Sequence, residues 1–146
     1  EIIKTTARGM LKKKGGRLIF ISSAAALRPN PGQGFYAAAK LASEALYKNL
    51  GLEMGSKGIT TVSLRPGYIN AGRGKKFIKQ NKKITDAIPV KRAIEPGEVA
   101  ETILFLLSES ARSFNAVEIT MDGGMSAGKP SEPVSKRPLS PDLCVR

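Results

Sequence analysis

The chain has 146 residues, 41% of them hydrophobic, and Lys plus Arg exceed Asp plus Glu by 12 charges. This length and composition predict about one globular domain. The sequence contains no histidine, which excludes Ser-His-Asp and Cys-His mechanisms and most zinc sites, so we expect no metal. The basic residues are scattered and not interleaved with aromatic ones, which predicts a solvated surface rather than a nucleic-acid site.

The first half of the chain predicts two helices and two strands. A helical pattern over residues 1–14 stops at a Gly-Gly pair, and the apolar run 17–22 predicts a buried strand. A Pro- and Gly-rich loop precedes a long helix over 36–57, which places Leu41, Ala45 and Leu52 on one face. The β-branched run 59–64 predicts a second strand, which ends at a Pro-Gly pair.

The second half predicts a polar segment, a helix and a third strand. Residues 70–91 are basic and irregular, with a short helix expected around 74–83. Pro96 and Glu98 suit the first turn of the next helix, and residues 116–124 predict a strand. We expect residues 1–128 to form the folded domain and the Pro-rich residues 129–146 to be a disordered tail.

Strands that alternate with helices predict an α/β fold with a parallel sheet and helices on both faces. In such sheets, ligands bind beyond the carboxyl ends of the strands. Three loops are expected at that edge, at residues 22–35, 65–75 and 122–128. A functional site is therefore expected among these loops.

Tyr36 and Lys40 share one helix face at the start of the long helix, next to the first of these loops. A phenol with an ordinary pKa of about 10 is a poor acid or base near neutrality, and a neighbouring ammonium favours its ionised form. Ser23 closes the preceding strand and can donate a hydrogen bond to a carbonyl or an alkoxide. Such a group could transfer protons for a carbonyl/alcohol couple, although a Tyr-Lys pair alone is also common on surfaces.

Several motifs together resemble the short-chain dehydrogenase/reductase family, whose members are NAD(P)-dependent Rossmann-fold oxidoreductases. Tyr36 lies 13 positions after Ser23 and begins a Y-x-x-x-K motif with Lys40. The stretch NPGQGFYAAAK is similar to the 3-oxoacyl carrier-protein reductase branch. The stretches LRPGYIN, EPGEVAETILFLLSE and ITMDGGM resemble the later family elements in their usual order. The resemblance covers residues 1 to about 128.

The resemblance implies a role for each matched residue. Tyr36 would be the general acid in reduction and the general base in oxidation, and Ser23 would polarise the substrate carbonyl. Lys40 would favour the phenolate and bind the nicotinamide ribose. The nicotinamide pocket of NAD or NADP would be lined by Tyr36 and Lys40 and, mainly through backbone, by Pro66, Gly67 and Ile69. The substrate would be a small carbonyl or alcohol, including a thioester on acyl-carrier protein or coenzyme A.

The sequence also departs from the family pattern. Ala71 stands where the family usually has a cofactor-binding Thr, and the T-G-x-x-x-G-x-G motif that binds the pyrophosphate does not occur in the chain. The stretch GYINAGRG has the glycine spacing of a P-loop but not its Lys-Ser/Thr. The resemblance therefore implies the C-terminal part of a doubly wound Rossmann-type sheet, with the N-terminal half missing and weak or no turnover by the chain alone.

Two other hypotheses remain open. One is a non-catalytic module of the same family that acts through oligomerisation, and the family's usual assembly makes a homo-oligomer plausible. The other is an anion- or nucleic-acid-binding protein, which rests on net charge alone. Glu1 in place of an initiator Met suggests a fragment or processed product. Cys144 is the only cysteine, and no apolar stretch suits a membrane span, so a reducing, cytoplasmic location is expected.

Overall fold

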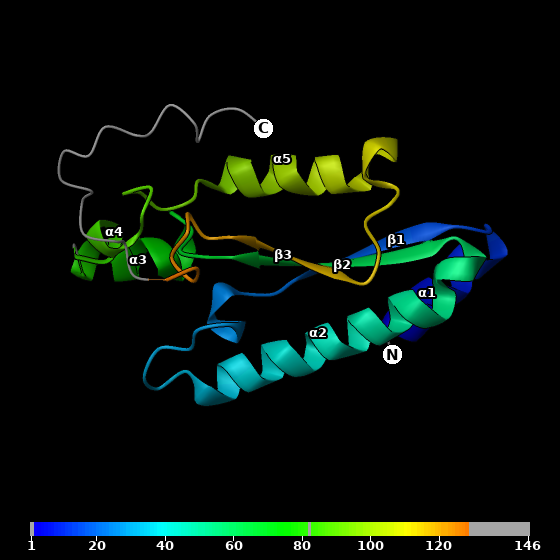
Figure 1. Ribbon diagram of the computed structural model, residues 1–146, viewed down its shortest axis with the longest axis horizontal. Coiled ribbons are helices and arrows are strands. Elements are labelled where there is room, and N and C mark those ends of the chain that lie inside the picture. Colours follow the sequence, from blue (N-terminus) through cyan, green and yellow to red (C-terminus); the bar gives the residue numbers. More distant parts are fainter. Residues whose placement is uncertain (1, 82, 129–146) are drawn as a thin grey trace, which may run out of the picture.

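The computed structural model describes residues 2–81 and 83–128 of the protein (Figure 1). The helices are α1 (Ile2–Lys12), α2 (Gly34–Met54), α3 (Gly72–Gln80), α4 (Lys83–Ala87) and α5 (Pro96–Leu107). The strands are β1 (Gly16–Ile21), β2 (Ile59–Pro66) and β3 (Val117–Met121). The predicted alternation of helices and strands is confirmed. The expected tail from residue 129 lies outside the described residues, so the two-part division of the chain stays a prediction.

The three strands form one parallel sheet in the order β1-β2-β3, which confirms the predicted α/β class. Gly16 of β1 pairs with Ile59, and Val62 of β2 pairs with Val117. Figure 1 shows α5 on one face of the sheet and α1 and α2 on the other. The central strand β2 is covered on both sides, and its residues 61–64 are all buried. Within the described part of the chain, β1 pairs with β2 and no strand borders its outer edge.

The face toward α5 holds an apolar core. Val62, Leu106 and Ala111 are buried there, and Ile19 and Val117 pack against them. Helix α5 begins at Pro96 with the capping arrangement that the Glu-Pro-Gly-Glu stretch predicts, because the Glu98 carboxylate accepts a hydrogen bond from the Glu95 N–H at 2.8 Å. This cap fixes the start of the helix close to the carboxyl ends of the strands.

On the other face of the sheet, helix α2 packs with residues other than its apolar row of Leu41, Ala45 and Leu52. The buried residues of α2 are Ala37, Glu44 and Gly51, each seven positions after the last. Side chains in odd positions of β2 face this helix: the Thr61 hydroxyl donates to the Tyr47 carbonyl, and Arg65 pairs with Glu44. Small residues and an acid on α2 complement these polar side chains and bring the helix close.

The apolar face that contains Leu41, Ala45 and Leu52 is exposed instead. Leu41 retains 45% and Leu52 retains 69% of its accessible surface. Helix α2 therefore carries apolar side chains on the surface that points away from the sheet. None of the helices in residues 2–81 and 83–128 is long and apolar enough to cross a membrane.

Candidate active site

The loops at the carboxyl ends of the strands surround a pocket of about 660 Å³. Its lining comes from the loop after β1 and the start of α2, from the segment that runs from β2 through α3, and from Met125 after β3. In Figure 1 these segments and α4 gather beyond the carboxyl ends of the strands. The expected meeting of three loops at this edge is therefore present in the structure.

Ser23 and Tyr36 both line this pocket. Ser23 has extended backbone and caps the short helical turn Ala24–Ala26, where its hydroxyl accepts a hydrogen bond from the Ala25 N–H at 3.2 Å. Tyr36 lies in the first turn of α2 and retains 49% of its accessible surface. The strand end and the helix start thus present two hydroxyl groups to one cavity that a ligand can enter.

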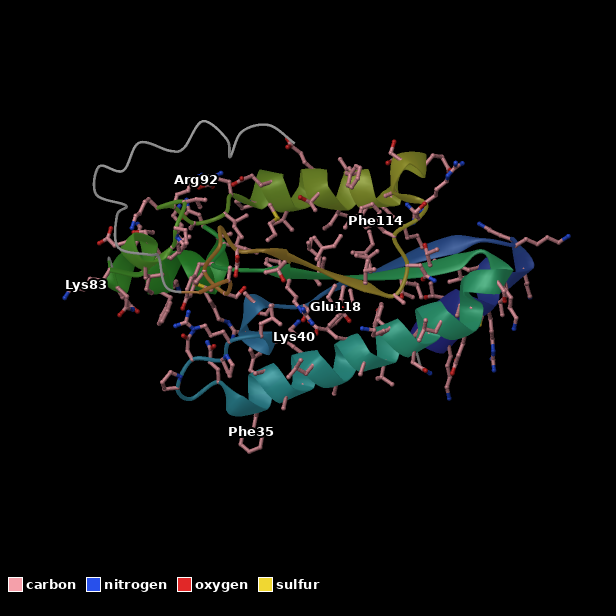
Figure 2. All side chains as sticks on the ribbon, viewed as in Figure 1. Phe35, Lys40, Lys83, Arg92, Phe114 and Glu118 are labelled. Atoms are coloured by element: carbon pink, nitrogen blue, oxygen red, sulfur yellow. The ribbon has the colours of Figure 1, made fainter. Side chains whose placement is uncertain are left out.

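Lys40 lies one helical turn after Tyr36, between α2 and the sheet (Figure 2). Its Nζ is 5.7 Å from the centroid of the Tyr36 ring and 5.0 Å from that of Phe20. It also donates a hydrogen bond to the carbonyl of Ile21 at 2.8 Å. These contacts hold a positive charge behind the phenol, although Lys40 itself does not line the pocket.

Glu44 continues the same row of α2 and forms a buried ion pair with Arg65. Two nitrogens of the guanidinium donate to the two carboxylate oxygens, Nε at 2.8 Å and Nη2 at 2.5 Å. Burial of the carboxyl alone would raise its pKa, but the hydrogen bonds and the charge of Arg65, with a smaller effect from Lys40, lower the pKa of Glu44 below its ordinary value. Glu44 therefore remains ionised, and its negative charge lies one helical turn after the ammonium of Lys40.

Pro66 is the last residue of β2, and Gly67 follows it. Pro66 pairs in register with Met121, and the Gly67 N–H donates to the Met121 carbonyl at 2.8 Å. A Cβ on Gly67 would lie 2.9 Å from Cβ of Asp122, closer than side chains tolerate. Gly67 also lines the pocket, and the absence of its side chain is what admits Asp122.

Ile69 forms an isolated parallel bridge with Ile94. The hydrogen bonds of this bridge use the Tyr68 carbonyl and the Asn70 N–H. The described residues provide no hydrogen bond to the N–H or the carbonyl of Ile69 itself. The Ile69 carbonyl oxygen lies directly against Gly74, where a Cβ would strike it, so the N–H is the backbone group of Ile69 that remains for an external partner.

Reasoning from sequence missed most of the outer wall of the pocket. Tyr68 and Phe77 stack at 5.7 Å between ring centroids, and the Tyr68 hydroxyl accepts a hydrogen bond from Asn30 at 3.1 Å. Three basic side chains also line this wall, Arg28, Arg73 and Lys76. Arg73 stands in the GYINAGRG stretch, whose glycines were the available signal. The fold alone brings Arg28 to the same place.

Comparison with known proteins identifies the family of the chain. A family model described as enoyl-(acyl carrier protein) reductase matches residues 1–126. A short-chain type dehydrogenase/reductase from Mycobacterium ulcerans superposes with a TM-score of 0.80 at 28% identity, over 88% of this chain and 48% of that one. The chain belongs to the short-chain dehydrogenase/reductase family.

Relatives within the short-chain dehydrogenase/reductase family include 3-oxoacyl-[acyl-carrier-protein] reductases. The FabG protein of Buchnera aphidicola (strain APS) is 37% identical over 126 residues, which is 86% of this chain and 52% of that protein. The 3-ketoacyl-(acyl-carrier-protein) reductase of Brucella melitensis, solved with NADH, has a TM-score of 0.73 at 27% identity, over 80% of this chain and 48% of that one. The chain thus spans about half the length of the curated relatives it matches.

Proposed function

We propose that the chain carries the proton-transfer site of an NAD(P)-dependent oxidoreductase that acts on a carbonyl/alcohol couple. The observation that carries this proposal is the shared pocket of Ser23 and Tyr36, with the Lys40 ammonium beside the Tyr36 ring. A phenol can act as a general acid or base, and a neighbouring cation favours its ionised form. Family membership supports the same assignment.

Each of the three residues has a role in this proposal. In reduction, the Tyr36 hydroxyl donates its proton to the oxygen that was the carbonyl, and in oxidation its phenolate removes the alcohol proton. The Ser23 hydroxyl donates a hydrogen bond to the same oxygen and orients it. Lys40 stabilises the negative charge that Tyr36 carries once its proton has left, because its ammonium lies 5.7 Å from the ring.

The backbone after β2 fits the nicotinamide part of the cofactor. The Ile69 N–H has no partner among the described backbone groups and could donate to the oxygen of a carboxamide, and Gly67 lines the pocket. We therefore assign the nicotinamide contact to Pro66, Gly67 and Ile69, together with Tyr36 and Lys40. The bound cofactor would supply the hydride, and the protein residues would supply the proton.

The relatives suggest a class of substrate. Several are named 3-oxoacyl-[acyl-carrier-protein] reductases, so we propose that a 3-oxoacyl thioester, on acyl-carrier protein or coenzyme A, is among the substrates to test first. A reaction that uses a nicotinamide cofactor also agrees with the expected cytoplasmic location. The pocket of about 660 Å³ is large enough to take a short acyl chain.

The proposal is tested by comparing the substitutions Tyr36→Phe and Tyr47→Phe. Both remove one phenolic hydroxyl from α2, but Tyr47 packs against Phe20 and does not line the pocket. For each variant of the purified chain, the rate of NADH or NADPH oxidation is measured with acetoacetyl-coenzyme A as the carbonyl substrate. Because the chain spans about half the length of its relatives, the assay includes a fusion that places the preceding half of the Buchnera relative before residue 1.

Tyr36→Phe is expected to lower kcat by about 100-fold or more, since this is the usual contribution of a positioned acid or base. Tyr47→Phe is expected to leave kcat within about twofold, because no reacting group is removed. Equal activity of the Tyr36→Phe variant and the unsubstituted protein would overturn the assignment.

A non-catalytic role through oligomerisation is the second candidate. It is favoured by the exposed apolar surface of α2, where Leu46 and Leu52 retain 65% and 69% of their accessible surface. Exposed leucines on a long helix suit packing against a second copy of the chain. A defined oligomer that turns over no carbonyl substrate, with or without the fused half, would favour this candidate over the first.

A further inference from the structure

The pocket next to Tyr36 is strongly one-sided in charge. Its 16 lining residues include three cationic side chains, Arg28, Arg73 and Lys76, and no Asp or Glu. A cleft lined by charge of one sign concentrates the electric field and raises the local concentration of counter-ions. The interior of the pocket is therefore attractive to an anion in a way that a mixed surface is not.

These three cations have no carboxylate partner in the part of the chain that the structure describes. The ion pairs there are Lys48–Glu118, Arg65–Glu44 and Arg92–Glu98, none of which involves a residue of the pocket. Arg28 donates one hydrogen bond, at 3.3 Å, to the carbonyl of Met125, which leaves its remaining N–H groups available. Each cation is thus free to bind an external anion.

The cations come from two different segments and line the same cavity as Ser23 and Tyr36. Arg28 belongs to the loop between β1 and α2, which also supplies Ser23, whereas Arg73 and Lys76 belong to α3. Arg73 and Lys76 are three positions apart and share one face of that helix. All three cations therefore line the same cavity as Tyr36.

The position of Arg73 and Lys76 differs from that of the other lysines of α3. All four side chains are exposed, but of these only Arg73 and Lys76 line the pocket. Their place in the pocket lining, shared with Arg28, therefore distinguishes them from Lys75 and Lys79. Guanidinium groups also bind carboxylates and phosphates with two parallel hydrogen bonds, which gives such a site geometric selectivity.

We propose that the pocket selects a substrate whose own structure carries an anionic group, a carboxylate or a phosphate ester, in addition to the reacting carbonyl or alcohol. Arg28, Arg73 and Lys76 bind the anionic group, and the reacting carbon lies at Ser23 and Tyr36. The inference rests on the proposed function for the reacting end. The binding of the anion itself requires no turnover and can be measured separately.

The test compares charged and neutral probes that share one reacting group. Acetoacetate is compared with methyl acetoacetate for the carboxylate, and dihydroxyacetone phosphate with dihydroxyacetone for the phosphate ester. Binding to the purified chain is measured at low salt by calorimetry and ligand-observed NMR. The charged member of at least one pair is expected to bind about tenfold more tightly, since a hydrogen bond to a charged group contributes this much. The pair with the larger ratio identifies the source of the anion.

The variants Arg28→Gln, Arg73→Gln and Lys76→Gln are each expected to remove most of this preference. The matched variants Lys75→Gln and Lys79→Gln change the net charge equally and are expected to retain it. Equal affinity for the charged and neutral probes, no binding of either, or an equal loss in the matched variants would overturn the proposal. The Tyr36→Phe variant is expected to keep the charge preference, so that failure of the proposed reaction and failure of anion binding give different results.

Discussion

Gly67 occupies a place where no side chain fits, between the end of β2 and Asp122. Asp122 is itself fixed, because its carboxylate oxygens accept hydrogen bonds from the N–H groups of Gly124 and Ser126 at 2.9 and 2.7 Å. A Cβ on Gly67 would lie 2.9 Å from Cβ and 3.0 Å from Cα of Asp122. The turn that borders the pocket therefore depends on this glycine.

The substitution Gly67→Ala is expected to destabilise the protein by about 1–3 kcal/mol, because the loop after β3 must move to admit the methyl group. Gly97→Ala is the control, since a Cβ at Gly97 meets no atom within 4 Å in the first turn of α5. That variant is expected to be stabilised by about 0.5–1 kcal/mol. Denaturant unfolding measures both, and a Gly67→Ala variant as stable as the unsubstituted protein would contradict the close contact.

Helix α2 is attached to the sheet through polar as well as small side chains. The side chains of Glu44 and Arg65 are only 3% and 13% exposed, and the two groups share two hydrogen bonds. Removal of one member of a buried ion pair leaves the other charge without compensation, which is the main source of its effect on stability. The pair therefore determines how firmly α2, and with it Tyr36 and Lys40, is held.

The substitution Glu44→Ala is expected to lower the free energy of unfolding by about 3 kcal/mol, because it leaves the Arg65 guanidinium buried and unpaired. Glu53→Ala is the matched control on the same helix, where Glu53 is exposed and accepts a hydrogen bond from Asn49. Its effect is expected to stay within about 0.5 kcal/mol. Equal decreases in the free energy of unfolding for both variants would contradict a stabilising role of the buried ion pair.

The start of helix α5 is held by an acid with a strongly lowered pKa. Hydrogen bonds from Arg92 and from the Glu95 N–H hold the pKa of Glu98 at about 2, against an ordinary value of 4.5. A pKa lowered in the folded state means that the cap contributes stability above pH 4.5 and loses it as the pH falls toward 2. Titration of the Glu98 carboxyl by NMR is expected to show a midpoint near 2, and a midpoint near 4.5 would contradict the cap.

The sequence predicted the elements of the fold but not the packing of α2. Glycine pairs, β-branched runs and the Glu-Pro-Gly-Glu stretch are local signals, and the corresponding strands and helices are confirmed within a few residues. The packed face of α2 depends instead on Thr61 and Arg65, which lie across the interface in β2. Residues 70–91 also form two helices rather than one, α3 and α4.

The candidate site was predictable in part for the same reason. Ser23, Tyr36 and Lys40 follow a linear motif of the family, so the resemblance suggested that they meet. The cationic wall has no such motif, because Arg28 in the loop after β1 and Arg73 in α3 are separated by the whole of α2 and β2. Only the three-dimensional arrangement of these segments brings the two charges to one pocket.

At the scale of the whole molecule, apolar side chains are exposed on both faces of the sheet assembly. On α2, Phe35 retains 98% of its accessible surface and points away from the body of the protein (Figure 2). On α5, Leu104 and Leu107 retain 67% and 53%. Apolar groups gathered on long helices at these exposures are typical of surfaces that bind another protein.

The chain is therefore expected to self-associate at concentrations of about 10–100 μM, in the usual range of weak contacts between apolar helices. Sedimentation velocity is measured for the unsubstituted chain and for Leu46→Glu and Leu104→Glu, which identify the helix involved. Lys57→Gln is the control, because it changes the net charge equally at an exposed site outside both helices. A chain that stays monomeric throughout this range would contradict the expectation.

The central claim is that Tyr36 and Lys40 act as one proton-transfer unit, and a double-mutant cycle on turnover tests it most directly. The kcat for a carbonyl substrate is compared for Tyr36→Phe, Lys40→Met and the double variant, in whichever of the chain or its fused form turns over. Because Lys40 acts through the Tyr36 phenol, the double variant is predicted to be about as slow as Tyr36→Phe alone. Losses that multiply, or a Tyr36→Phe variant with full activity, would contradict the account.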